Sequence, residues 1–225
     1  MNKSKSAGDR ADAIVSRLRR KYRDAKIPLE FATPWQLLVA VILSAQCTDE
    51  RVNKVTRELF RKYRTPEDFA AARASELAKA VFSTGFYRAK AKNIAGAAKA
   101  VIEKFGGKVP RTMEEILTLP GVARKTANVV LAHAYGVVEG IAVDTHVRRL
   151  AARMGLTSEN DPVKIERDLM SVVARNNWRN VSLLLQYHGR AVCRAAKPAC
   201  GACLLSDICP SAYSFGEKPA GKNKK

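Results

Sequence analysis

The chain has 225 residues, 47% of them apolar, which suits one large domain or two small ones with packed cores. Forty Lys and Arg against 21 Asp and Glu leave a net charge of +19. This excess favours a polyanionic partner, nucleic acid first; a generally basic soluble protein or a membrane-surface binder is the alternative. The N-terminus shows no secretory signal, and the longest apolar run, residues 37–45, is too short to span a bilayer. We therefore expect a cytoplasmic protein, in whose reducing compartment clustered cysteines are more often metal ligands than disulfides.

Helix signals recur along the chain and alternating strand patterns are absent, so an all-α fold is predicted. Asp9 is the expected N-cap of a first helix that runs to about Ala25. The segment Thr33-Pro34-Trp35-Gln36 supplies an N-cap, an N1 proline and a capping-box partner for the next helix. Cap and glycine-stop signals predict further helices over residues 48–63, 65–72, 75–82 and 87–105.

In the second half of the chain, Thr112 begins a second capping box whose helix reaches Leu117. The helical pattern then breaks at 119–123, a segment with proline and glycine, and resumes from Arg124 to Tyr135, which indicates a helix, a hairpin and a helix. Later helices are predicted over residues 144–154, 161–173 and 181–193. The tail 214–225, rich in Lys, Gly and Pro, is predicted to be disordered.

The hairpin and the lysine that follows it form a candidate reactive site. A bend with Gly121 can present backbone N–H groups and a helix N-terminus to a phosphate, although an ordinary helix connection has the same pattern. Lys125 would lie in the first turn of the following helix. A lysine amine attacks carbon only when neutral, and the helix terminus, Arg124 and partial burial each favour loss of its proton. Lys125 is a candidate nucleophile; an exposed phosphate-binding lysine is the alternative.

Asp144, in the segment Val143-Asp144-Thr145-His146, is a predicted helix N-cap. The helix dipole and the capped N–H groups favour an ionised carboxylate there. Such a carboxylate could relay the proton of the lysine and stabilise positive charge on a sugar ring, a role compatible with capping. His146, one turn further on, is expected to support the site rather than to act as an acid or base.

Four of the five cysteines lie within one short loop-rich stretch, with the spacing Cys193-x6-Cys200-x2-Cys203-x5-Cys209. Four thiolates can hold either an iron–sulfur cluster or a tetrahedral zinc ion, so ligand type does not decide between them. Zinc fingers usually combine two close pairs, whereas here only Cys200 and Cys203 form one. Cys47, far away on an apolar helix, is expected to be a buried thiol.

These motifs together resemble one family. The segment 119–127 (LPGVARKTA), the segment 143–146 (VDTH) and the cysteine quartet match, in order and spacing, the endonuclease III family of helix-hairpin-helix DNA glycosylases. The segments 43–46 (LSAQ) and 85–91 (GFYRAKA) also resemble the two DNA-wedge segments of that family, so the resemblance covers about residues 10–212.

The resemblance implies a two-lobed molecule that acts as a monomer on double-stranded DNA. A six-helix barrel would span residues 28–137, and residues 1–27 with 138–213 would form a lobe around a [4Fe–4S] cluster held by the four cysteines. Lys125 would be the nucleophile at C1′ of a damaged nucleotide and Asp144 its activating carboxylate. The enzyme would remove oxidised pyrimidines and cut the strand as an AP lyase.

The resemblance also implies a set of residues that contact DNA. Gln46 and the loop from Gly85 to Arg88 would fill the gap left by an extruded base. The loop between Cys193 and Cys200 would approach the DNA backbone. The expected DNA-binding residues are Gln46, Phe86, Arg88, Gly121, Ala123, Arg124, Thr126, His146, Arg194 and Lys197.

Two residues depart from the family pattern. Ala123 replaces a common second glycine of the hairpin, and we expect it to restrict positive φ and to alter phosphate contact. Phe86 replaces a common leucine in the second wedge loop, where it could stack on bases and shift the lesion preference; a core aromatic is the alternative reading.

Two other functions fit part of the pattern. A mismatch-adenine glycosylase shares the hairpin, the aspartate and the cluster, but such relatives usually lack a lysine at the position of Lys125 and carry an extra C-terminal domain. A non-catalytic DNA-binding module with a zinc knuckle would explain the charge, the hairpin and the cysteines, but not the spacing of Lys125 and Asp144.

Overall fold

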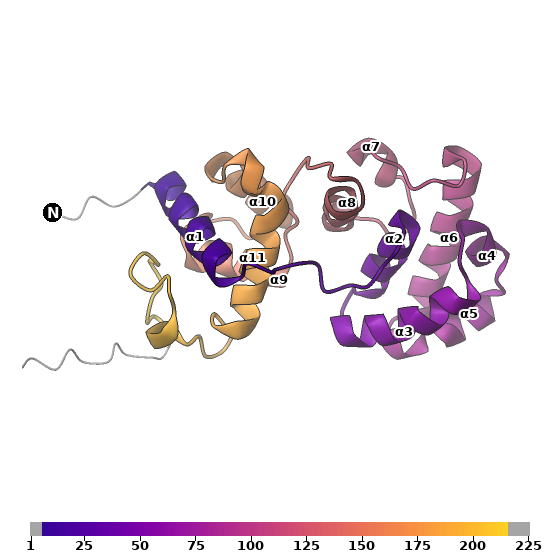
Figure 1. Ribbon diagram of the computed structural model, residues 1–225, viewed down its shortest axis with the longest axis horizontal. Helices are drawn as coiled ribbons and strands as arrows, with labels where there is room; N and C mark the ends of the chain where they lie inside the picture. The colour runs from indigo at the N-terminus through magenta and orange to yellow at the C-terminus, as the bar shows by residue number, and fades with distance from the viewer. Residues whose placement is uncertain (1–5, 216–225) are drawn as a thin grey trace, which may run out of the picture. The chain divides into compact units, whose positions relative to one another are not determined.

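The computed structural model describes residues 6–215, and within that range the chain is helical without a strand, which confirms the all-α prediction (Figure 1). The chain divides into two compact units. We call residues 27–139 the central unit; the terminal unit combines the chain up to residue 26 with the chain from residue 140 on. For comparison with the central unit, the six-helix barrel that the resemblance implies spans residues 28–137.

The central unit contains the hairpin and both candidate wedge loops. Its helices are α2 (Pro34–Leu43), α3 (Asp49–Lys62), α4 (Pro66–Ala71), α5 (Ala74–Ala80), the 3-10 helix η1 (Phe82–Thr84), α6 (Tyr87–Phe105), α7 (Met113–Ile116), α8 (Arg124–Val130) and the π-helix η2 (Leu131–Tyr135).

Threonine N-caps begin four of these helices. The hydroxyl oxygens of Thr33, Thr48, Thr65 and Thr112 accept hydrogen bonds from the backbone N–H groups at the starts of α2, α3, α4 and α7. Each cap satisfies a donor that the helix itself leaves unpaired. The Gln36 side chain accepts from the N–H of Ala32 at 2.8 Å, one residue before the cap, instead of closing the expected box on Thr33.

The core of the central unit is built around α2, which is buried on nearly all sides. Phe69 of α4 is fully buried, with its ring centroid 5.5 Å from that of Trp35 and 5.3 Å from that of Tyr63. Along the other side of the core, α6 packs against α4 and α5 (Figure 1). No described helix is both long and apolar enough to cross a membrane.

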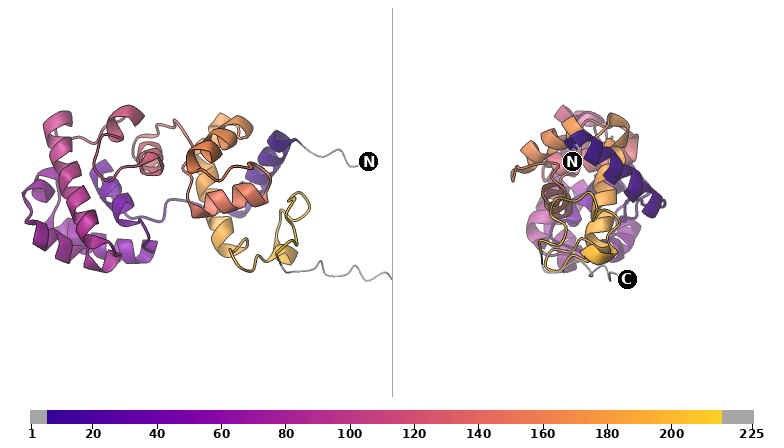
Figure 2. Two further views of the ribbon diagram at one scale, coloured as in Figure 1. Left: turned by 180° about the vertical axis from the view of Figure 1, so that it is seen from behind. Right: turned by 90° about the vertical axis from the view of Figure 1, so that its left-hand side faces the viewer.

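The terminal unit joins the two ends of the chain. Its α1 (Ala7–Lys21) packs against α10 (Pro162–Val172) and α11 (Trp178–Ala191), and α9 (Thr145–Arg153) packs against the same two helices (Figures 1 and 2). Two short 3-10 helices, η3 (Arg175–Asn177) and η4 (Cys200–Ala202), complete this unit.

Some predicted helix ends were wrong. Ser6, not Asp9, caps α1: its hydroxyl accepts from the N–H of Asp9, whose carboxylate accepts in return from the N–H of Ser6. This helix ends at Lys21 instead of near Ala25. The last long helix begins at Trp178, three residues before the predicted start, because η3 leads directly into it.

The tail predicted to be disordered from residue 214 begins in ordered structure. The N–H of Ser214 donates to the carbonyl of Ser211 at 3.2 Å, and the guanidinium of Arg153 lies 4.1 Å from the ring centroid of Phe215. The prediction was therefore wrong for residues 214 and 215, and its remaining residues, 216–225, lie outside the described part of the chain.

We expect Phe69→Ala to lower the free energy of unfolding of the central unit by about 3–5 kcal/mol, because it leaves a cavity against Trp35 and Tyr63. Urea unfolding followed by Trp35 fluorescence, in a Trp178→Phe background, measures this unit. Phe82→Ala is the matched control, since Phe82 is 62% exposed. Equal losses in both variants would contradict the core assignment.

Candidate functional site

The hairpin between α7 and α8 requires a glycine at its bend. Gly121 has φ +78°, and the N–H of Val122 closes the turn on the carbonyl of Leu119 at 3.1 Å. A Cβ on Gly121 would lie only 2.8 Å from the Cβ of Asn93 on α6. Both the backbone conformation and the close approach of α6 therefore exclude a side chain here.

We expected Ala123 to restrict positive φ in the hairpin, but the structure needs no positive φ at this residue. Its φ of −101° and ψ of 171° are extended backbone that any residue adopts, so alanine fits there without strain. Ala123 is also the N-cap of α8, and its side chain makes no capping hydrogen bond. The first turn of α8 therefore begins without a side-chain acceptor on its N–H groups.

Lys125 lies in that first turn, between Arg124 and Thr126, and all three are half-buried. Within residues 6–215, no hydrogen-bond or ion-pair partner holds the Lys125 amine. Among the described residues the amine is thus uncommitted, as a nucleophile must be.

Asp144 belongs to the terminal unit, where it caps α9. Its Oδ1 accepts from the N–H of Val147 at 2.8 Å, which confirms the predicted N-cap. The carboxylate is half-buried, and the cap uses only one of its oxygens among the described residues. The capping role therefore leaves the carboxylate available for chemistry.

His146 lies in the first turn of α9, beside Arg149. Its Nδ1 is 3.2 Å from Nη2 of Arg149, which also donates to the carbonyls of Gly189 and Cys193. Burial lowers the pKa of Arg149 from its ordinary value. The contacts of His146 thus connect the start of α9 to the end of α11.

Two loops of the central unit carry non-glycine residues in the left-handed conformation. Gln46, after α2, has φ +52°, and Phe86, just before α6, has φ +47°. Gln46 is exposed, and Phe86 is 66% exposed, so the core reading of Phe86 was wrong. Arg88 is exposed as well, with its guanidinium 5.6 Å from the ring centroid of Tyr87. Positive φ is costly for residues with side chains and often marks functional loops.

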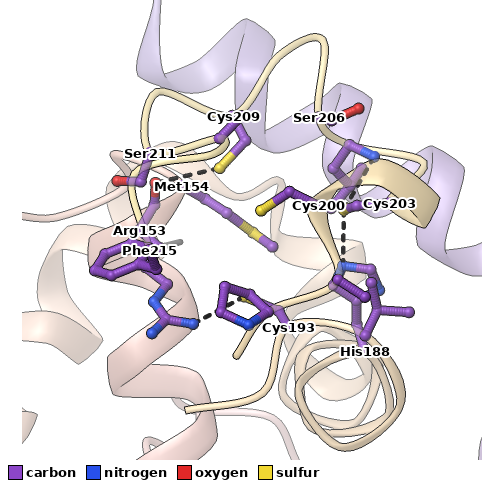
Figure 3. Close-up of a pocket in the computed structure, with 15 residues that line it drawn as sticks. Arg153, Met154, His188, Cys193, Cys200, Cys203, Ser206, Cys209, Ser211 and Phe215 are labelled. Atoms are coloured by element: carbon purple, nitrogen blue, oxygen red, sulfur yellow. Dashed lines mark hydrogen bonds between the residues drawn. The ribbon is translucent and has the colours of Figure 1, made fainter. Parts of the chain in front are cut away.

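The four clustered cysteines line one pocket of the terminal unit (Figure 3). All four come from the segment that follows α11, with Cys200 at the start of η4, and the side chain of Met154 lies among them (Figure 3). Among residues 6–215, no three His, Cys, Asp or Glu side chains are placed to share a single metal ion. Arg194 and Lys197 are exposed on the segment between the first two cysteines.

Arg153 and backbone groups surround the cysteine sulfurs. Arg153 Nη1 lies 3.4 Å from the Sγ of Cys193 and donates to the carbonyl of Arg194 at 2.7 Å, while Nη2 donates to the carbonyl of Ala195 at 2.7 Å. The N–H of Leu205 lies 3.4 Å from the Sγ of Cys203. These donors can stabilise negative charge on the sulfurs.

His188, fully buried on α11, lines the same pocket as the cysteines. Its Nε2 is 3.4 Å from the Sγ of Cys203, and its Nδ1 is 3.2 Å from the hydroxyl of Tyr22. Burial lowers the pKa of His188 to about 4, so the ring is neutral near pH 7 and carries one N–H. Donation from Tyr22 to Nδ1 and from Nε2–H to the sulfur satisfies both nitrogens.

An ion pair attaches α1 to the cysteine loop. Arg17 binds both carboxylate oxygens of Asp207, at 2.5 and 2.9 Å, and donates to the carbonyl of Leu204 at 2.9 Å. Burial raises the pKa of the thiols of Cys203 and Cys209, because a buried site disfavours the charged thiolate. These contacts of Arg17 therefore hold the cysteine loop against α1.

Sequence reasoning missed Lys90, Arg153 and His188. Arg153 and His188 looked like ordinary helix residues, and only the tertiary structure brings them to the cysteines. Lys90 gave a signal that could have been used: it occupies the same helical stripe as Ile94 and Ala97, which are buried. A lysine in a buried stripe is unusual and indicates a specific partner.

Comparisons with known proteins agree with these features. Residues 39–175, more than half of the chain, match the model of the HhH-GPD superfamily base excision DNA repair proteins. Endonuclease III of Synechocystis sp. is 55% identical over 95% of this chain and 98% of its own, and endonuclease III of Bacillus subtilis is 47% identical over 82% and 84%.

Solved structures give the same result. A trapped endonuclease III–DNA covalent intermediate superposes with a TM-score of 0.88 at 40% identity, covering 92% of this chain and 97% of that one. A thermostable thymine-DNA glycosylase gives 0.83 at 26% identity, covering 93% and 100%. The chain therefore belongs to the endonuclease III family within the HhH-GPD superfamily of base excision DNA repair proteins.

Proposed function

We propose that this protein removes oxidised pyrimidines from duplex DNA and then cleaves the strand at the resulting abasic site. The observation that carries this proposal is the uncommitted amine of Lys125 in the first turn of the helix that follows the hairpin. A related endonuclease III was crystallised as a trapped covalent intermediate with DNA, which supports a nucleophilic mechanism for this chain.

In the first chemical step, the neutral amine of Lys125 forms a bond to C1′ as the glycosidic bond breaks, and the base departs with the proton that the amine gives up. Transfer of a proton from solvent to O4′ then opens the sugar ring and leaves a protonated imine. The imine acidifies C2′, and loss of a C2′ proton expels the 3′ phosphate, which cuts the strand. Water finally hydrolyses the imine and releases the enzyme.

Asp144 would accept the proton that the amine loses and stabilise positive charge on the sugar. Its N-cap hydrogen bond with Val147 holds the carboxylate on a rigid helix end. Because Lys125 and Asp144 belong to different units, the proposal requires both units to present their groups to the same nucleotide.

The target base must leave the stack before it can react, at a cost of about a few kcal/mol. Gln46 and Phe86 are proposed to fill the space that it vacates. Both are exposed on loops, and the backbone of each is in the left-handed conformation. Phe86 offers a flat apolar face on which a neighbouring base can stack. Arg88, two residues later, adds a positive charge beside it.

The hairpin is proposed to hold a DNA phosphate. The backbone at Gly121 and Ala123 can approach closely, and the uncapped N–H groups that open α8 point along the helix axis. Arg124 and Thr126 add a cation and a hydroxyl. Arg194 and Lys197, which are exposed on the cysteine loop, and His146 of α9 are proposed as further DNA-contacting residues.

Cys193, Cys200, Cys203 and Cys209 are proposed to hold a [4Fe–4S] cluster. The donor set fits: four thiols line one pocket, with N–H donors from Arg153, His188 and Leu205 near their sulfurs. A tetrahedral zinc ion would need all four sulfurs about 2.3 Å from one point, and these residues are not placed to share one ion. A bound cluster would cross-link the loop.

We expect Lys125→Ala to abolish the covalent protein–DNA adduct that borohydride traps at a damaged or abasic site, because the imine forms only on this amine. Gel electrophoresis of trapped adducts measures the outcome. Lys108→Ala, which removes an exposed lysine of the same unit, should trap like the wild type. Equal trapping by Lys125→Ala and the wild type would rule out this nucleophile.

Asp144→Asn separates capping from catalysis. The amide oxygen can still accept from Val147, so thermal stability should hardly change, whereas loss of the charge should lower the excision rate by about a hundredfold or more. Single-turnover kinetics and thermal unfolding measure the two effects. A stable variant with wild-type excision would restrict Asp144 to its capping role.

Gly121→Ala should weaken binding to duplex DNA, because a Cβ there collides with Asn93 and the backbone has positive φ. Ala123→Gly should bind like the wild type, since Ala123 is already extended without strain. Fluorescence anisotropy at several salt concentrations measures both variants. The phosphate-holding role of the hairpin would be refuted by a Gly121→Ala variant that is folded and binds normally.

The purified protein should contain iron and sulfide in equal amounts, and Cys203→Ser should lose both. Cys47→Ser is the matched control, because Cys47 lies in the central unit and is not among the pocket residues. Metal and sulfide analysis of the three proteins decides the outcome. Zinc without iron in the wild type would favour the zinc knuckle instead.

A further inference from the structure

A buried lysine connects the two candidate wedge loops. Lys90, in the first turns of α6, is only 4% exposed. Its Nζ donates to the carbonyl of Leu43 at 2.8 Å and to the carbonyl of Thr84 at 2.7 Å. Within residues 6–215 these two backbone carbonyls are its hydrogen-bond partners, and no carboxylate pairs with it.

Both carbonyls end a helix that leads into a wedge loop. Leu43 is the last residue of α2, three residues before Gln46, and Thr84 is the last residue of η1, two residues before Phe86. In each loop, the residue in the left-handed conformation thus lies two or three residues after a backbone carbonyl that Lys90 binds.

The arrangement has a plain physical reason. Carbonyls at helix ends lack N–H partners, and a buried carbonyl without a donor is unfavourable. One ammonium satisfies two such carbonyls from different helices, so the two ends cannot shift independently without losing a charged hydrogen bond. Burial lowers the pKa of Lys90 from its ordinary value, because it removes water from around the charged ammonium.

Local contacts stiffen the same loops on either side of the lysine. The Ser44 hydroxyl donates to the carbonyl of Val41 at 2.8 Å, and the Thr84 hydroxyl donates to the carbonyl of Val81 at 2.8 Å. Lys90 is therefore the contact that joins two loops, each of which is already braced by itself.

We propose that Lys90 is a positioning residue that sets the spacing between Gln46 and Phe86, so that both side chains enter the duplex together when a base is extruded. This inference rests on the proposed function. Lys90 does not touch the reacting atoms; it acts through the two loops. Its contribution should be largest where a paired base must be unstacked, and smallest where no base has to move.

Lys90→Met tests the inference, because Met keeps the apolar stem and removes the donors. Lys104→Met is the matched control: it removes one charge from the same helix at an exposed position. Each protein is given two duplexes, one with an oxidised pyrimidine in a base pair and one with a preformed abasic site. Single-turnover rates are measured on both, and the fluorescence of 2-aminopurine beside the lesion reports unstacking.

We expect Lys90→Met to lose at least about tenfold in excision of the paired lesion, as misplacement of positioning groups does, with a weaker 2-aminopurine signal. Cleavage at the abasic site should stay close to the wild-type rate, and Lys104→Met should match the wild type throughout. Unchanged excision, or an equal loss on both duplexes, would overturn the inference. A wild type inactive on both duplexes would refute the proposed function itself, and the inference with it.

A double-mutant comparison separates positioning from general stability. In a Gln46→Ala/Phe86→Ala background, Lys90→Met should cause no further loss of excision, because the side chains it positions are gone. A further loss as large as in the wild-type background would overturn the inference. If Lys90→Met does not fold, Lys90→Gln is measured against the same outcomes, because its amide leaves a polar group in the pocket but is too short to bridge the carbonyls of Leu43 and Thr84.

Discussion

The helix starts of the central unit differ in how they satisfy their backbone N–H groups, and the loops proposed to bind DNA lie beside uncapped starts. Threonine hydroxyls close the starts of α2, α3, α4 and α7. The starts of α6 and α8, which follow the Phe86 loop and the hairpin, have no side-chain cap, and neither has α5. Uncapped N–H groups need another acceptor, and a phosphate oxygen is a good one. The uncapped starts of α6 and α8 coincide with the loops proposed to bind DNA.

Much of the helix pattern could be predicted because its signals are local. Thr33, Thr65 and Gly106 mark helix ends through hydrogen bonds and φ values set within a few residues. Ser6 was missed because Asp9, its partner in the box, is an equally good cap by residue type. Tertiary facts were out of reach: the exposure of Phe86 and the extended backbone of Ala123 depend on how neighbouring segments pack.

The candidate site was likewise predictable only in those features that depend on local sequence. The spacing of the four cysteines predicted a shared pocket, which the structure contains, but not the donors around it. Arg153 and His188 reach the sulfurs from α9 and α11, far from the loop in sequence. Lys90 could have been noticed from its place in a buried stripe, but its partners could not, because backbone carbonyls leave no mark on the identity of the residues that carry them.

The helix α9 gives a physical reason why a metal centre could matter in a reaction without electron transfer. It begins at the cap residue Asp144 and ends at Arg153, whose guanidinium holds Cys193 and the carbonyls that follow it. Nine residues of helix span roughly 14 Å, so the proposed catalytic carboxylate and the cysteine pocket are opposite ends of one rigid rod. Arg149, midway along, also binds the carbonyl of Cys193. If the cysteine loop were loosened, the Arg153 end of α9 would lose the contacts that hold it. The carboxylate of Asp144 would then lose its orientation while its hydrogen bond with the N–H of Val147 was still intact.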